Sequence, residues 1–249
     1  MDLGLKGRTA IVCGASSGMG LAIADALASE GANVTMFARR RDPLEREAER
    51  LGALAVRGDL IVPKDLANLV EQTVGAFGGI DILVNNGGGP PAGPAAGTTD
   101  HAIEVAVELL LLSAIRLTNL CLPYLEASGR GRIVNIESSS VRAPIDNLAL
   151  SNAVRPGVVG WMKTLAREVG PKGITVNTIA PGRINSAQIL KLHPTEQSRA
   201  DYIKQNIPAG YFGEPHDIGH LVAFLASPLA RYINGAAIPV DGGATRRAL

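Results

Sequence analysis

Short apolar segments alternate with longer helical patterns along almost the whole chain. The apolar segments are rich in β-branched residues and are bounded by Gly, Pro or Asn, which is typical of buried strands. They predict strands at Thr9–Cys13, Asn33–Phe37, Ala53–Val56, Asp81–Val84, Arg132–Ile136, Thr175–Ile179 and Ala236–Val240. The patterns between them predict helices at Gly20–Ser29, Pro43–Leu51, Lys64–Phe77, Asp100–Ala127, Leu150–Val169 and Pro215–Ala226. This alternation favours βαβ units, and therefore one α/β domain over residues 1–249 in which helices cover both faces of a parallel sheet.

Two segments depart from this alternation. Asn85–Gly97, which reads NNGGGPPAGPAAG, holds too much Gly and Pro for a helix or a central strand, so we expect a loop. This loop follows the fourth strand, and open α/β sheets bind ligands at the carboxyl ends of their strands. The segment from Pro181 to about Asn206 is long and polar and directly follows a strand, so we expect a substrate loop there.

Charge and composition exclude several classes of protein. The chain has 24 Lys and Arg against 23 Asp and Glu, and 4% of its residues are aromatic, so nucleic acid is not an expected partner. The two cysteines lie in apolar runs and predict no disulfide framework and no metal site. The most apolar stretch, Ala102 to Leu117, contains three charged residues and is expected to fall short of a membrane span. No signal-peptide pattern follows the N-terminus, so we expect a cytoplasmic protein.

A glycine-rich turn follows the first strand and opens directly into a helix. It reads Gly14-Ala15-Ser16-Ser17-Gly18-Met19-Gly20. Glycines let backbone N–H groups approach a pyrophosphate closely, and the helix N-terminus adds partial positive charge. In isolation such a turn often serves steric needs alone, but its place in the first βαβ unit favours dinucleotide binding.

The residues at the end of the second strand indicate which dinucleotide is expected to bind. An acidic residue at that position binds the ribose 2′-hydroxyl of NAD, whereas Arg accommodates a 2′-phosphate. The chain offers Arg39 and Arg40 there, with no acid before Asp42. A solvated basic turn is the alternative, but the missing carboxylate favours NADP(H) over NAD(H).

Taken together, these motifs resemble the short-chain dehydrogenase/reductase family over almost the whole chain. The Gly14–Gly20 turn is similar to the family's TGxxxGxG, with Cys13 in the Thr position. The other matching motifs are Asp59-Leu60 (adenine contact), Asn85-Asn86-Gly87-Gly88 (the NNAG signature), Pro181-Gly182 (nicotinamide flank), and Gly235 with Val240-Asp241-Gly242-Gly243. The resemblance implies a Rossmann fold with a doubly wound seven-stranded sheet, a nicotinamide cofactor and usually a homotetramer or a homodimer. Within the family, 3-oxoacyl-acyl-carrier-protein reductases look closest, which implies a small-molecule or acyl-chain substrate.

The resemblance also assigns catalytic positions, and three of the four are changed. Ser138 matches the family Ser that polarises the carbonyl, although Ser139 and Ser140 could shift that register. Ser151 stands at the position of the proton-donating Tyr, and Arg155 at that of the Lys that holds the nicotinamide ribose. Leu110 falls at the position of the Asn that orders a water relay.

Each change alters the chemistry. A serine hydroxyl is shorter and far less acidic than a phenol, so Ser151 is a poor general acid, and loss of such an acid costs ~10²–10⁴ in rate. Arg155 keeps cationic donors on the same helical face but cannot donate a proton at neutral pH. Other residues could replace the proton-donating Tyr. Three of them, Tyr202, Tyr211 and His193, lie in or beside the substrate loop. The fourth is Glu137, but the alternation of side chains along a strand points its side chain away from that of Ser138.

Two hypotheses follow. The first is an NADP(H)-dependent oxidoreductase acting on a carbonyl or alcohol through a divergent site. The second is a non-catalytic nucleotide-binding sensor or partner subunit. In either case we expect self-association, because the Asp100–Ala127 helix is apolar on most sides and one sheet face covers a single side. Together with the Leu150–Val169 helix it predicts an isologous interface.

Overall fold

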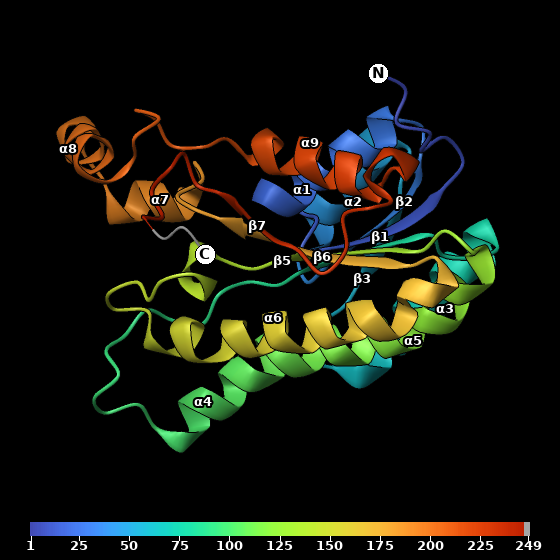
Figure 1. Ribbon diagram of the computed structural model, residues 1–249, viewed down its shortest axis with the longest axis horizontal. Coiled ribbons are helices and arrows are strands. Elements are labelled where there is room, and N and C mark those ends of the chain that lie inside the picture. The colour runs from blue at the N-terminus through green and yellow to red at the C-terminus, as the bar shows by residue number, and fades with distance from the viewer. Residues whose placement is uncertain (247–249) are drawn as a thin grey trace.

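The computed structural model describes residues 1–246, and within them seven strands form one parallel sheet (Figure 1). The strand order is β3-β2-β1-β4-β5-β6-β7, so the chain reverses its direction of progress between β1 and β4. The doubly wound seven-stranded sheet expected from the sequence is confirmed. The last three residues of the predicted domain, 247–249, lie outside the described residues.

The strands agree with the sequence pattern closely. They are β1 Thr9–Cys13, β2 Asn33–Ala38, β3 Leu54–Arg57, β4 Ile82–Asn86, β5 Arg132–Ile136, β6 Thr175–Pro181 and β7 Ala237–Val240. One difference concerns Asn85 and Asn86, which were expected in a loop but belong to β4. They pair with Asn135 and Ile136 of β5, and the buried Asn85 side chain donates to the Asn135 side chain at 2.9 Å. This hydrogen bond satisfies the buried amide groups of the two asparagines, which allows polar residues to occupy a central strand.

Helices cover both faces of the sheet, as Figure 1 shows. One face carries α1 (Gly18–Ser29), α2 (Arg41–Leu51) and α9 (Pro215–Ala226), whose apolar residues share one buried cluster. The other face carries α3 (Pro63–Phe77), α5 (Ser113–Ser128) and α6 (Ala149–Val169), which share a second cluster. The central strands β1, β4, β5 and β6 are buried throughout, as expected for a parallel sheet covered on both sides.

The helix expected at Asp100–Ala127 forms in three consecutive parts. α4 (Asp100–Val107) leads into a π-helical turn, Glu108–Leu112, which continues as α5. The whole helix, Asp100–Ser128, has a mean hydropathy of 1.8 in its most apolar window, and 39% of that window is buried. By length and composition it is therefore able to cross a membrane, contrary to the expectation from its charged residues. In the fold, however, it packs against the sheet through α5.

The substrate segment is not the loop that its polarity predicted. It contains α7 (Ala187–Leu192) and α8 (Glu196–Asn206). Ser186 and Thr195 cap these helices with their side chains, a local signal that was present in the sequence. We call this substrate segment the lid. A small apolar cluster of Ile189, Ile207 and Phe212 holds the lid together, separately from the two main clusters.

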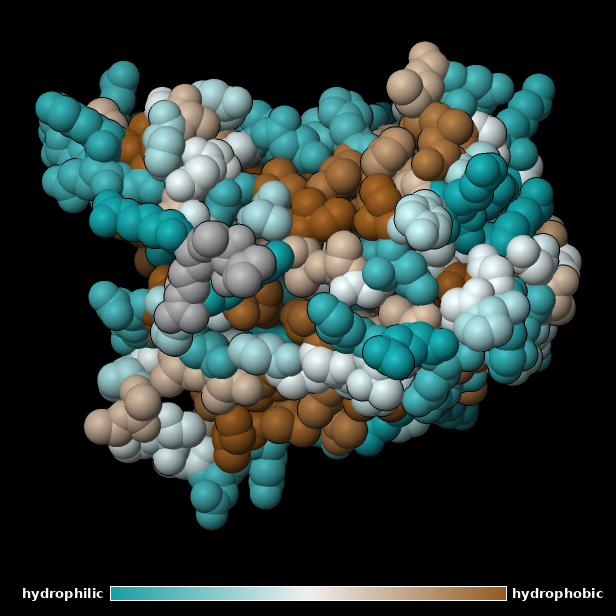
Figure 2. All heavy atoms as spheres, in the orientation of Figure 1, coloured by the Kyte–Doolittle hydropathy of each residue, from teal (hydrophilic) through white to brown (hydrophobic). Residues whose placement is uncertain are grey.

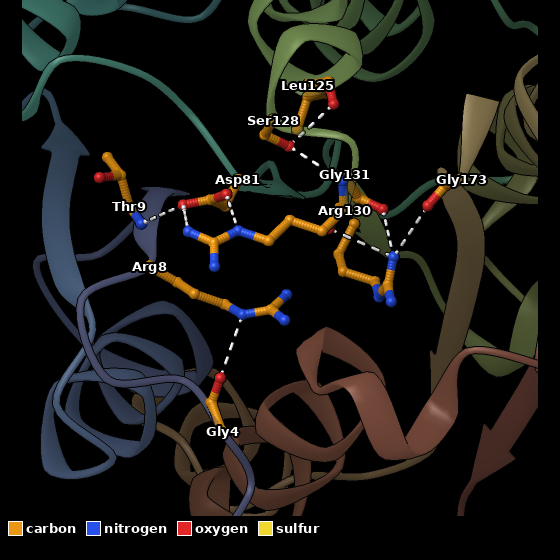
Figure 3. A network of polar contacts seen from close by, with 10 residues as sticks. Gly4, Arg8, Thr9, Asp81, Leu125, Ser128, Arg130, Gly131 and Gly173 are labelled. Carbon is orange, nitrogen blue, oxygen red and sulfur yellow. Dashed lines mark hydrogen bonds and ion pairs between the residues drawn. The ribbon is translucent and has the colours of Figure 1, made fainter.

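The amino edge of the sheet is held by a polar network of the side chains in Figure 3. The Asp81 carboxylate accepts from the backbone N–H of Thr9 at 2.9 Å and from Arg130 Nε at 2.7 Å. Arg8 Nε donates to the carbonyl of Gly4 at 3.1 Å. This network ties β1, β4 and β5 together at the end opposite to the predicted ligand site, so its role is structural.

Candidate active site

Most of the predicted site residues lie at the carboxyl edge of the sheet, in two groups. The first group surrounds the ends of β1 and β2 and contains the glycine-rich turn and the arginines. The second surrounds the ends of β4 and β5 and the start of α6. The reversal of strand order between β1 and β4 lies between them, which is where α/β sheets bind dinucleotides.

The glycine-rich turn has the backbone that its sequence predicts. Gly14 and Gly18 adopt positive φ angles of 63° and 58°. A Cβ on Gly20 would lie 2.2 Å from the Gly14 carbonyl oxygen, so only glycine fits where α1 meets the turn. Gly18, by contrast, has no atom within 4 Å of the place where a Cβ would stand. Ser17 precedes α1 without capping it by its side chain, so this side chain leaves the first N–H groups of α1 free for an anion.

The two arginines after β2 lie differently. Arg40 Nη2 donates to Ser17 Oγ at 2.8 Å and to Ser16 Oγ at 3.3 Å, so its guanidinium lies against the glycine-rich turn. Arg39 is 77% exposed and lies 3.8 Å from the Asp59 carboxylate. Within residues 1–246 no carboxylate pairs with Arg40. Its positive charge is therefore available to a phosphate, whereas that of Arg39 is partly compensated.

The motifs that contain Leu60, Asn86 and Gly87 lie between the two groups. The Asn86 side chain is buried and donates to the Cys13 carbonyl at 3.0 Å, which fixes the end of β4 to the end of β1. A Cβ on Gly14 would lie 2.8 Å from that same amide nitrogen. Leu60 and Gly87 line a small cavity that reaches Arg155. Asn86 thus acts by shaping the site, since its amide is already used inside the protein.

Arg155 is the centre of the second group. Its Nε donates to Ser151 Oγ at 3.2 Å, one helical turn earlier, and its Nη2 donates to the carbonyl of Gly88 at 3.4 Å. Its Nη1 donates to Glu137 Oε2 at 2.9 Å. The two charged side chains are 8% and 6% exposed, so the guanidinium and the carboxylate form a buried ion pair.

Glu137 therefore belongs to the site. Strand alternation predicted that its side chain points away from that of Ser138, but it did not reveal that the Glu137 carboxylate meets Arg155. Burial raises the pKa of Glu137 to about 7, although Arg155 opposes this shift by its charge and its hydrogen bond. The signal available in the sequence was an acid directly after a buried strand, together with Arg at a Lys position.

The serine cluster after β5 supplies hydroxyls to the same place. Ser138 Oγ accepts from the backbone N–H of Ser140 and so caps a short 3-10 turn, Ser139–Val141. Ser140 Oγ lies 3.3 Å from Ser151 Oγ. Ser140 is thus the serine in direct contact with Ser151, which stands at the position of the family Tyr. The sequence left Ser140 open as an alternative to Ser138 for the family Ser.

A cavity of about 20 Å³ adjoins Glu137 and Arg155. Its lining is Leu60, Asn85, Asn86, Gly87, Leu109, Leu110, Ser113, Ala114, Ile136, Glu137 and Arg155. This volume is enough for one water molecule. Leu110 is buried in an apolar cluster with Ala106 and Val154. It cannot hold a water by hydrogen bonds, which leaves the Glu137 carboxylate as the charged acceptor at this position.

The other proposed substitutes for Tyr lie in the lid. Tyr202 Oη accepts from Arg183 Nε at 3.1 Å, and its ring centroid lies 4.6 Å from that of His193, with the ring planes tilted by 46°. Tyr211 is exposed. Pro181 ends β6, and the N–H of the next residue, Gly182, donates to the carbonyl of Val240 at 2.9 Å. None of these three aromatic side chains bonds to the Ser151–Arg155 cluster within the part of the chain that the structure describes.

This arrangement fits a dinucleotide. The first group provides the glycine cradle, free helix N–H groups and the Arg40 cation. The second group provides hydroxyls and two guanidinium N–H groups of Arg155 that bond to no described residue. No group of His, Cys, Asp or Glu side chains suited to a metal occurs among residues 1–246.

Comparison with known proteins supports the resemblance seen in the sequence. A family model described as enoyl-(acyl carrier protein) reductase matches residues 14–245. The chain is 35% identical over 245 residues to a 3-oxoacyl-acyl-carrier-protein reductase of Vibrio cholerae, which covers 97% of this chain and 98% of that protein.

Solved structures are similar over the whole fold. The L-sorbose reductase of Gluconobacter frateurii, complexed with NADPH and L-sorbose, is 32% identical with a TM-score of 0.95, covering 99% of this chain and 100% of that one. An NADPH-bound short-chain oxidoreductase of Pseudomonas aeruginosa PAO1, described as containing an atypical catalytic center, is 32% identical with a TM-score of 0.92. That match covers 97% of this chain and 98% of the other.

Proposed function

The chain belongs to the short-chain dehydrogenase/reductase family and is an NAD(P)-dependent oxidoreductase; we propose that it uses NADP(H) to interconvert a carbonyl and an alcohol. The observation that carries the choice of cofactor is Arg40, a guanidinium held on the glycine-rich turn by Ser16 and Ser17. The NADPH in two structural neighbours supports the same choice. The relatives make a small-molecule or an acyl-chain carbonyl the substrate to test first.

The two groups of residues divide the work of holding the cofactor. The Gly14–Gly20 turn and the N-terminus of α1 hold the pyrophosphate, and Arg40 with Arg39 holds the 2′-phosphate. Asp59 and Leu60 border the adenine, while Gly88 and Arg155 hold the nicotinamide ribose. Pro181 and Gly182 flank the nicotinamide, which supplies the hydride when bound.

The serine hydroxyls act on the substrate oxygen. Ser138 and Ser140 donate hydrogen bonds that polarise the carbonyl, and these bonds strengthen as negative charge develops on the oxygen. Ser151 is the hydroxyl at the Tyr position, activated by the Arg155 N–H at 3.2 Å. Because a serine is a weak acid, we expect slow proton delivery, ~10²–10⁴ below that of a phenol.

Turnover of NADPH with a panel of ketones and acyl-chain carbonyls tests this proposal. We expect measurable turnover, at least tenfold tighter binding of NADPH than of NADH, and a larger loss of activity from Ser138→Ala than from Ser151→Ala. Ser29→Ala, at the far end of α1, is the matched control and should leave turnover unchanged. Binding of NADPH without turnover of any carbonyl or alcohol would favour the sensor or partner subunit instead.

We propose further that the protein is a cytoplasmic homodimer or homotetramer. The supporting observation is the incomplete cover of the Asp100–Ser128 helix, on which Val105, Leu120 and Tyr124 stay exposed. Figure 2 shows hydrophobic residues gathered along the lower edge of the molecule, around α4. Burying these side chains favours association. Light scattering that gave the mass of a single chain would contradict the proposal.

A further inference from the structure

The Glu137–Arg155 pair is an isolated pair of charges inside the protein. A guanidinium group is a cation at neutral pH, so with an ionised Glu137 the pair carries no net charge. The groups around Glu137 come from the end of β4, the π-helical turn, the start of α5 and α6. They are Asn85, Asn86, Gly87, Leu109, Leu110, Ser113, Ser151 and Arg155, of which Arg155 alone is charged. The charge of this pocket therefore depends on the state of one carboxyl.

The place of Glu137 in the sheet brings this charge close to the reacting end of the cleft. β5 lies between β4 and β6, and the backbone N–H of Glu137 donates to the Ile179 carbonyl of β6 at 2.9 Å. The loop after β4 supplies Gly88, which accepts from Arg155. β6 ends at Pro181. Glu137 is thus flanked by the two segments between which the nicotinamide is proposed to lie.

We propose that the Glu137 carboxylate sets the relative affinity of the site for oxidised and reduced cofactor, an inference that rests on the NADP(H) binding proposed above. The oxidised nicotinamide ring is a cation, and the reduced ring is neutral. With the carboxylate present, Arg155 is compensated and the pocket accepts the cationic ring. Without the carboxylate, the pocket carries one positive charge and disfavours the oxidised form. Charges interact strongly here because both side chains are buried.

The pKa of Glu137, raised to about 7 by burial, adds a dependence on pH to this arrangement. The carboxyl is mostly protonated at pH 6 and mostly ionised at pH 8, so the preference for the oxidised form should rise over that interval. The 2′-phosphate is common to both forms of the cofactor, and its own titration cancels in the ratio of their dissociation constants.

The experiment measures the dissociation constants of NADP⁺ and NADPH for the unmodified protein, Glu137→Gln and Glu137→Asp. Glu137→Gln keeps an acceptor for Arg155 but removes the charge, and should raise the ratio Kd(NADP⁺)/Kd(NADPH) on the order of tenfold, equal to about 30 mV in the potential of the bound cofactor. Glu137→Asp keeps the charge and should keep the ratio within about twofold of the unmodified value, even if both affinities fall. Glu126→Gln, which removes the carboxylate of a surface pair with Lys172, is the matched control.

A purely structural role for Glu137 would weaken both forms equally and leave the ratio unchanged in Glu137→Gln, which would overturn the proposal. If the variants do not fold, the unmodified protein decides the question, because the ratio should fall on the order of tenfold between pH 6 and pH 8. A constant ratio over that interval would contradict the inference. Failure of both forms to bind would instead contradict the proposed function.

Discussion

Arg40 and Arg155 are both guanidinium groups at the carboxyl edge of the sheet, but their surroundings are opposite. Arg40 lies near the surface and bonds to the neutral hydroxyls of Ser16 and Ser17. Arg155 is buried and its shortest bond is to the carboxylate of Glu137. The first cation is thus uncompensated and ready for a phosphate, whereas the second is neutralised within the protein.

The two arginines therefore lie in two halves of the proposed cofactor site that differ in how the protein treats the charge. The half around Arg40 needs only a positive charge near solvent, which a local motif provides. The half around Arg155 takes two charges out of water, which is favourable only when they remain paired. Changes at Arg155 should therefore affect stability as well as function, whereas changes at Arg40 should affect binding alone.

The largest expected effect is that of Arg155→Ala. The change leaves Glu137 buried without its cation and should lower the free energy of unfolding at pH 8 by about 3–5 kcal/mol. Denaturant unfolding measures it. Lys172→Ala, which breaks the exposed pair with Glu126, is the control and should cost ~1 kcal/mol or less. Removing both partners, in Arg155→Ala with Glu137→Ala, should recover part of the loss; a double variant no more stable than the single one would show that the pair is not the cause.

The next effect concerns pH. Because the pKa of Glu137 rises from 4.5 in its ordinary state to about 7 in the fold, the folded protein holds this proton more tightly than the unfolded chain. The bound proton of Glu137 therefore adds to the free energy of unfolding. This contribution is full below pH 4.5 and is lost as the pH rises through 7, a change of about 3 kcal/mol or less. Unfolding curves of the unmodified protein and of Glu137→Gln should diverge in this way between pH 5 and pH 8. Parallel curves would place the carboxyl in a more polar environment than the structure does.

The smallest effect is expected in the Arg40 half. Arg40→Ala should weaken NADPH about tenfold, or ~1.4 kcal/mol, and leave NADH and the free energy of unfolding nearly unchanged. Arg39→Ala should weaken NADPH binding less, because the charge of Arg39 is partly compensated by the Asp59 carboxylate at 3.8 Å. Titrations with both cofactors measure the two affinities. An equal loss for NADH would mean that Arg40 supports the turn and does not read the phosphate.

The structure also changes what a return to the ordinary family site requires. Ser151→Tyr with Arg155→Lys restores two residues of the family pattern but leaves Glu137 in place. A lysine at position 155 has a point charge and a different reach from the fork of Arg155, so it need not satisfy the carboxylate in the same way. Glu137 and Leu110 therefore belong in any such design.

The sequence by itself determined the fold, and it predicted the residues that we propose to hold the cofactor. Hydrophobic periodicity fixed the strands to within a few residues, because each element shows its pattern locally. The glycine-rich turn and the arginines after β2 could be recognised in the sequence for the same reason, since each is a short motif of neighbouring residues. The helices α7 and α8 were missed because the polarity of the lid obscured the capping residues Ser186 and Thr195.

Only the tertiary structure decided the Arg155 half. Glu137 and Arg155 are 18 residues apart, and their pairing depends on how α6 packs on the sheet against β6. The contact of Ser140 with Ser151 depends on the same packing, through a turn whose direction no periodicity specifies. A buried charge is stable only beside its partner, and that partner is chosen by distance in space, which a pattern along the chain does not contain.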